Sequence, residues 1–105
     1  MEFLETSVFT KQISGLLRDH EYAKLQIYLT NQPDAGALIP QGGGLRKVRW
    51  KAKGKGKRSG IRVIYYWYFS RSQIFMLLAY KKSGSSDLSK RQFKELERVI
   101  KKGVL

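Results

Sequence analysis

Residues 61–81 read IRVIYYWYFSRSQIFMLLAYK, and this stretch decides the fold. Residues 61–69 are rich in β-branched and aromatic side chains, a composition that favours a central β-strand. Residues 70–72 supply a turn, and residues 73–80 are apolar enough to form a second buried strand. Two buried strands joined by so short a turn predict an antiparallel pair in the middle of a sheet.

A third strand is predicted directly upstream, at residues 45–51. Its side chains alternate, with one face made of Leu45, Lys47, Arg49 and Lys51 and the other of Arg46, Val48 and Trp50. This strand therefore has one cationic face. The run that follows, 52–60, intersperses glycines with Lys53, Lys55, Lys57 and Arg58. Glycines and like charges give this run no reason to pack, so we predict a mobile basic hairpin loop.

The N-terminal third predicts a short strand followed by a helical hairpin. The strand is expected at residues 3–6, and Ser7 is expected to cap the first helix. Helical spacing relates the apolar residues Phe9, Ile13, Leu16 and Leu17. A second stripe contains Tyr22, Leu25, Tyr28 and Leu29. The second helix should end near Asn31, because Pro33 prevents its continuation.

A last helix is predicted after a loop at residues 81–86. Ser89 is its expected N-cap, Gln92 occupies the capping-box position, and Gly103 ends it. Its apolar stripe contains Phe93, Leu96, Val99 and Ile100. The chain of 105 residues is expected to form one domain with the order β-α-α-β-β-β-α. This is an α+β fold with a small antiparallel sheet and helices packed on one face.

The distribution of charge gives the strongest indication of function. Lys and Arg number 21 against 8 Asp and Glu, a formal net charge of +13 at pH 7. Residues 35–86 contain twelve Lys or Arg and no acidic residue. A compact domain with this excess is expected to bind a polyanion, of which the nucleic-acid backbone is the commonest. A surface charged for solubility alone is usually of mixed sign.

Cations from three predicted strands converge on one region. Lys47 and Arg49 share a strand face, and antiparallel pairing brings Arg62 of the next strand close to them. Lys81 and Lys82 leave the end of the last strand. Since this part of the chain has no carboxylate to neutralise them, we expect an anionic ligand.

RNA can be cut at its own 2′-hydroxyl if a base, a cation and an acid surround the phosphate. Histidine chemistry is disfavoured because the only histidine, His20, lies far from the basic strand, and metal-assisted cleavage is disfavoured because residues 35–86 lack Asp and Glu. We expect no cofactor.

A lysine crowded by other cations gives up its proton more readily, so Lys47 is a candidate base and Lys82 a candidate acid. Arg49 and Arg62 would stabilise the charge of the transition state. The alternative is that these cations only bind phosphate.

Aromatic residues crowd the same strands. Tyr66 falls on the same strand face as Arg62, and Tyr80 directly precedes Lys81 and Lys82. Aromatic rings beside cations suit stacking of single-stranded RNA bases. The alternative, for each ring taken singly, is a place in the core with the hydroxyl at the surface. Tyr80 is the ring that we expect to be exposed.

These features together resemble the RelE/HigB family of mRNA interferases, closest to its HigB-like branch. The resemblance extends over nearly the whole chain and is carried by residues 43–49 (GGLRKVR), 53–58 (KGKGKR), 60–66 (GIRVIYY), 80–82 (YKK) and 87–89 (DLS). It implies the same order of helices and strands. It also implies that the chain is the toxin of a type II toxin–antitoxin pair and cleaves mRNA in the ribosomal A site.

The resemblance also assigns roles to residues. Lys47 and Arg49 match the family's catalytic cations on the first central strand, Arg62 matches its Gly-x-Arg arginine, and Lys82 or Lys81 matches the cation after the last strand. Further RNA contacts are expected from Lys51, Lys53, Lys55, Lys57, Arg58, Tyr66, Tyr80 and Lys81. The implied partners are the ribosome with its mRNA and a cognate antitoxin, expected to be a helix-turn-helix protein. Some relatives carry Tyr or His near the C-terminal helix, where this chain has Leu88.

Gyrase-poisoning ParE proteins share the family fold without cutting RNA, so a non-catalytic basic toxin or nucleic-acid-binding module is the alternative. The N-terminus lacks the pattern of a signal peptide, and no apolar stretch is long enough to cross a bilayer. We therefore expect a cytoplasmic protein.

Overall fold

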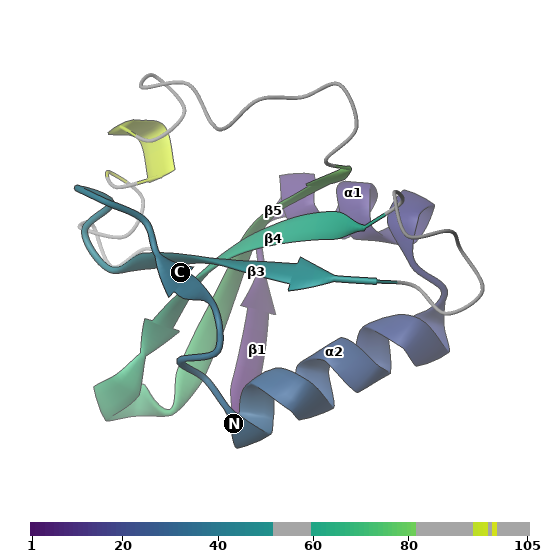
Figure 1. Cartoon of the computed structure of the whole chain (residues 1–105), viewed down its shortest axis with the longest axis horizontal. Helices are drawn as coiled ribbons and strands as arrows, with labels where there is room; N and C mark the ends of the chain where they lie inside the picture. The colour runs from purple at the N-terminus through teal and green to yellow at the C-terminus, as the bar shows by residue number, and fades with distance from the viewer. Residues whose placement is uncertain (52–59, 82–93, 97, 99–105) are drawn as a thin grey trace.

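The computed structural model describes residues 1–51, 60–81, 94–96 and 98. Its elements are β1 (Glu2–Glu5), α1 (Ser7–Leu16), α2 (Asp19–Asn31), β2 (Ala37–Leu38), β3 (Leu45–Trp50), β4 (Ile61–Tyr68), the 3-10 turn η1 (Phe69–Arg71) and β5 (Gln73–Lys81). Residues 94–96 and 98 are helical (Figure 1). The α+β prediction is confirmed. The predicted cap of the last helix, Ser89 with Gln92, and its end at Gly103 lie outside the described residues.

The strands form one five-stranded sheet in the order β1-β5-β4-β3-β2. The β3-β4-β5 meander is antiparallel, as predicted, and β1 enters the same sheet beside β5. The β1–β5 pair is parallel, and the two strands are connected through both helices and the strands β2, β3 and β4. The sequence did not predict β2, which is only two residues long and pairs with Lys47 and Arg46 of β3.

The two N-terminal helices begin and end close to the predicted residues. The N-cap of α1 is Thr6 rather than Ser7, because the Thr6 hydroxyl accepts a hydrogen bond of 3.0 Å from the Phe9 N–H. At the start of α2, the Arg18 N–H donates to Oε1 of Glu21 at 2.9 Å. Within the described ranges, no helix combines the length and apolar character needed to span a membrane.

The main hydrophobic core lies between α1, α2 and one face of the sheet. Phe9, Ile13 and Leu29 from the helices meet Val63 and Met76 from the strands. The other face has a smaller cluster made of Leu45, Ile64, Phe75 and Leu77, against which Leu96 packs. The prediction that helices cover one face therefore holds for α1 and α2, whereas the helical residues near the C-terminus contact the opposite face through Leu96.

Tyr65 anchors the crossing from α2 to β2. Its ring is fully buried, and its hydroxyl donates to the Pro33 carbonyl at 2.7 Å and accepts from the Gly36 N–H at 2.9 Å. Gly36 has no room for a side chain, since a Cβ there would lie 2.8 Å from the Tyr65 ring. Burial raises the pKa of Tyr65, which keeps the hydroxyl protonated as a donor.

Replacing Tyr65 with Phe is expected to lower the free energy of unfolding by about 1–3 kcal/mol, because the buried Gly36 N–H loses its acceptor. Urea denaturation followed by circular dichroism measures the change. Tyr28→Phe, at a position that is 36% exposed, is the matched control. Equal stability of wild type and Tyr65→Phe would contradict the anchoring role.

Tyr22 ties α2 to β1. Its hydroxyl donates to Oε2 of Glu5 at 2.6 Å, while Oε1 of Glu5 accepts from the Thr10 hydroxyl at 2.6 Å. Burial of the ring, with the hydrogen bond to Glu5 as the second cause, raises the pKa of Tyr22 far above its usual value.

This raised pKa predicts a loss of stability at alkaline pH. The Tyr22 hydroxyl stays protonated in the fold but ionises near pH 10 in the unfolded chain, so its contribution is complete below pH 10 and declines above it. The slope is at most about 1.4 kcal/mol per pH unit for one group. Unfolding free energies measured between pH 8 and 11 should therefore fall more steeply for wild type than for Tyr22→Phe. Parallel curves would rule out this linkage.

Candidate nucleic-acid interface

Lys47, Arg49 and Arg62 project from the sheet face that α1 and α2 leave uncovered, which we call the cationic face. Strand alternation fixes this placement, because Val48 and Val63 belong to the helix-side core. In the register of the sheet, Arg49 lies opposite Arg62 and Arg62 lies opposite Tyr80. Directly opposite residues have Cβ atoms about 4.5–5.5 Å apart. Arg49, Arg62 and Tyr80 thus form a row across β3, β4 and β5.

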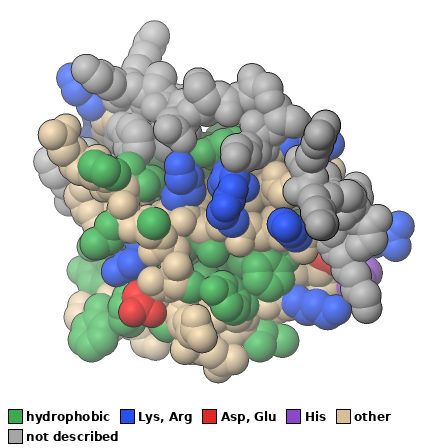
Figure 2. All heavy atoms as spheres, in the orientation of Figure 1, with side chains coloured by type: hydrophobic (Ala, Val, Ile, Leu, Met, Phe, Trp, Pro, Cys, Tyr) green, Lys and Arg blue, Asp and Glu red, His purple; other side chains and the backbone are tan. Residues whose placement is uncertain are grey.

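The space-filling view shows the same gathering of charge. Lys and Arg side chains cluster in the middle of the visible face, over β3 and β4 and beside the atoms drawn in grey (Figure 2). Among the residues coloured by type in this view, few acidic side chains are visible (Figure 2). The predicted convergence of Lys47, Arg49 and Arg62 on one side of the sheet is therefore present in the structure.

Arg62 is the most enclosed cation of the row. Its side chain is only 7% exposed, and among described residues its one hydrogen bond runs from Nη1 to the neighbouring Ile61 carbonyl at 3.4 Å. A Cβ added to Gly60 would lie 3.6 Å from this nitrogen. A guanidinium has five N–H donors, so the described residues use only a small part of its donor capacity.

Arg49 adds a second guanidinium directly opposite Arg62. Like charges in directly opposite positions destabilise a sheet. Within the part of the chain that the structure describes, neither arginine forms an ion pair with a carboxylate. An anion held between the two guanidinium groups would remove the repulsion, and phosphate suits their planar donor geometry.

Two lysines lie beside this pair of arginines. Lys47 is half-buried and lies on the cationic face two residues before Arg49, opposite Ile64. Lys51 is exposed and follows β3, and its Cγ lies 3.8 Å from the position of a Cβ at Gly60. Since Nη1 of Arg62 approaches the same position, Lys51 lies beside Arg62.

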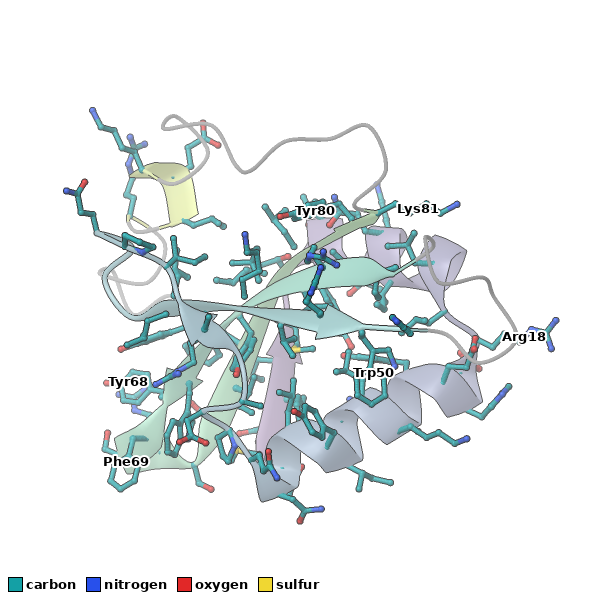
Figure 3. All side chains as sticks on the ribbon, viewed as in Figure 1. Arg18, Trp50, Tyr68, Phe69, Tyr80 and Lys81 are labelled. Atoms are coloured by element: carbon teal, nitrogen blue, oxygen red, sulfur yellow. The ribbon has the colours of Figure 1, made fainter. Side chains whose placement is uncertain are left out.

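Tyr80 and Lys81 lie at the end of β5 (Figure 3). Tyr80 is half-buried and faces Arg62 across the strands, so its ring is part of the row. The sequence predicts an exposed Tyr80, whereas in the structure it is half-buried. Lys81 is exposed and pairs with Ile61, whose side chain belongs to the helix-side core. Alternation thus directs the Lys81 side chain away from the cationic face. Lys81 is close to Arg62 only because it follows Tyr80 at the end of β5.

Tyr66 lies on the cationic face but away from the row of arginines. Four residues along β4 separate it from Arg62, a distance of roughly 13 Å. Its ring packs 6.1 Å from Tyr68 and 6.3 Å from Phe75, measured between ring centroids, and covers Gly44. Tyr66 is half-buried in this aromatic cluster, which leaves part of the ring at the surface.

Five of the predicted site residues lie outside the described residues: Lys53, Lys55, Lys57, Arg58 and Lys82. Among the residues that are described, no three His, Cys, Asp or Glu side chains come together as a group that could hold a metal ion. The feature that sequence reasoning missed is a β-bulge in β5, where the pairing with β4 shifts between Ile64 and Tyr65. No pattern in the sequence marks this bulge, because residues 74–79 of β5 are apolar without interruption.

The arginine pair leads to a prediction about stability and anions. Arg49→Gln should raise the free energy of unfolding at low salt by about 0.2–1 kcal/mol, because it removes a like charge opposite Arg62. Inorganic phosphate should stabilise wild type more than this variant. Urea denaturation with and without phosphate measures both effects, and Lys24→Gln, an exposed position on α2, is the control. A destabilised Arg49→Gln, or equal stabilisation by phosphate, would contradict the prediction.

Comparison with known proteins bears on this fold. No protein-family model matches the sequence. Among solved structures, the crystal structure of the isolated E. coli RelE toxin superposes on this chain with a TM-score of 0.53 at 16% sequence identity. The superposition covers 93% of this chain and 97% of the RelE chain. The likeness expected from the sequence is therefore present in the architecture, and the chain has a RelE-like fold.

Proposed function

We propose that this chain is the toxin of a type II toxin–antitoxin pair and a metal-independent endoribonuclease that cleaves mRNA in the ribosomal A site. The observation that carries the proposal is the pair of guanidinium groups, Arg49 opposite Arg62, on a sheet face that α1 and α2 do not cover. The likeness to RelE supports a toxin of this type. The excess of positive charge supports a polyanionic substrate.

The proposed reaction uses the nucleophile that RNA itself carries. The 2′-oxygen attacks the adjacent phosphorus and forms a P–O bond while its proton passes to a base. The bond from phosphorus to the 5′-oxygen then breaks, and that oxygen takes a proton from an acid. The products are a 2′,3′-cyclic phosphate and a free 5′-hydroxyl, so the step needs no water and no redox partner.

Each member of the site has a role in this reaction. Arg62 and Arg49 bind the phosphate oxygens and stabilise the charge that builds up on them, since arginine stays protonated and its donors fit an oxyanion. Lys47, on the same face two residues from Arg49, is the proposed base. Lys82, outside the described residues, is the proposed acid. Lys51, Lys53, Lys55, Lys57, Arg58 and Lys81 are proposed to bind the flanking RNA backbone.

Tyr80 is proposed to stack on a nucleobase. It is the aromatic residue directly opposite Arg62, so a base on its ring would leave the attached phosphate within reach of the guanidinium. Tyr66 is proposed as a second stacking surface farther along β4.

The ribosome would present the mRNA as a single strand, and a cognate antitoxin, expected to be a helix-turn-helix protein, would cover the cationic face.

Arg62→Met tests this assignment, because Met retains much of the side-chain volume and removes the charge. The variant should still fold and should cut mRNA about a hundredfold more slowly, since a positioned donor to the transition-state oxyanion is lost. Primer extension on a reporter mRNA after induction measures the cuts, and a reporter without a start codon shows whether they require translation. Lys24→Met is the matched control on α2.

Two outcomes would contradict the proposed function. Undiminished cutting by Arg62→Met would remove Arg62 from the reaction. Growth arrest by wild type with intact mRNA and continuing translation would favour the non-catalytic, ParE-like alternative instead.

A further inference from the structure

The bulge in β5 decides which face of the sheet Tyr80 occupies. Phe75 lies opposite Tyr66 before the bulge, whereas Leu78 lies opposite Ile64 after it, so Leu77 is the extra residue. If the earlier register continued, Ala79 would lie opposite Arg62, and Tyr80 would lie opposite Ile61 on the helix side. One additional residue therefore turns Tyr80 onto the cationic face.

Two side chains, one from the N-cap of α1 and one from the middle of this helix, hold the bulged segment. The Thr6 hydroxyl donates to the Leu77 carbonyl at 2.9 Å, and Oε1 of Gln12 accepts from the Ala79 N–H at 2.9 Å. These bonds fall on either side of Leu78. They satisfy backbone groups of β5 beyond Met76, the last residue of β5 that pairs with β1.

Both bonds are specific to the bulged register. A slide of β5 by one residue would carry the Leu77 carbonyl and the Ala79 N–H away from Thr6 and Gln12, and would leave these backbone groups without their partners. It would also move Ala79, only 2% exposed, out of the helix-side core. The register thus depends on α1, which lies against β5 at this end (Figure 1).

We infer that Thr6 and Gln12 are positioning residues for the RNA site, because they fix the bulge that places the Tyr80 ring opposite Arg62. This inference rests on the proposed function for the role of Tyr80 in stacking, but the placement of Tyr80 is independent of it. Neither residue lies on the cationic face, and both act through the backbone of β5.

The first test reads the register directly. Gln12→Met removes the acceptor at similar side-chain length, Gln12→Glu retains an acceptor oxygen, and Ser14→Ala, exposed on α1, is the control. In Gln12→Met the Ala79 amide should exchange its hydrogen at least about tenfold faster, a loss of about 1.4 kcal/mol of protection. Nuclear Overhauser contacts between the Tyr80 ring and the Arg62 side chain should weaken. Gln12→Glu should restore the slow exchange.

The second test asks whether Gln12 acts through Tyr80. Binding is measured with a short single-stranded oligoribonucleotide whose 2′-hydroxyls are methylated, so that it cannot be cut. Gln12→Met should weaken binding about fivefold or more, the least expected for one lost base stack. In a Tyr80→Ala background the same change should have no further effect, whereas a merely structural role would weaken binding in both backgrounds.

The outcomes separate this inference from the proposed function. Unchanged Ala79 exchange and an unchanged Tyr80–Arg62 contact in Gln12→Met would overturn the inference, as would equal weakening of binding in both backgrounds. If Gln12→Met does not fold, Thr6→Val against Thr6→Ser repeats the comparison at the Leu77 carbonyl. If wild type does not bind RNA, the proposed function fails, while the exchange and contact measurements still decide the role of Gln12.

Discussion

The repulsion between Arg49 and Arg62 is the constraint on which the rest of the site depends. The two residues occupy directly opposite positions on β3 and β4, and Arg62 is almost fully enclosed. Such a pair persists only because other interactions set the register. Val48 and Val63 are themselves paired and buried on the helix side, so a slip of one residue would expose them to water. The hydrophobic core thus holds two like charges together that would otherwise separate.

A fixed pair of guanidinium groups differs in its chemistry from flexible surface lysines. The donors of Arg62 are placed by a buried strand before any ligand arrives, so the proposed reaction would need little reorganisation as charge develops on a phosphate oxygen. Exposed lysines such as Lys51 contribute long-range attraction and lose more side-chain freedom on binding. In the proposed reaction the two kinds of cation would therefore act at different steps. The lysines would attract the RNA, and the arginines would align its phosphate.

Sequence alternation predicted the cationic face correctly, because a period of two places Lys47 and Arg49 on one side of any regular strand. It failed where the backbone departs from regularity. The bulge at Leu77 reverses which face of the sheet the later residues of β5 occupy. The side chains that hold it, Thr6 and Gln12, lie 65 or more residues away in the sequence. The parallel pairing of β1, the short strand β2 and the cap at Thr6 likewise depend on tertiary contacts that no local pattern contains.

Arg46 shows that position on the strand, more than residue type, decides what a cation does in this fold. It lies between Leu45 and Lys47 on β3, so its side chain leaves from the other face of the strand. There its Nη1 donates to the carbonyl oxygens of Asp34 at 3.2 Å and Gly36 at 2.8 Å, and so helps Tyr65 to hold the crossing into β2. Backbone carbonyl oxygens accept the hydrogen bonds of Arg46. Arg49 and Arg62 lie on the other face of the sheet, where each is directly opposite the other. Since β3 supplies both environments, alternation along one strand separates the arginine that holds the backbone, Arg46, from the arginine that faces Arg62.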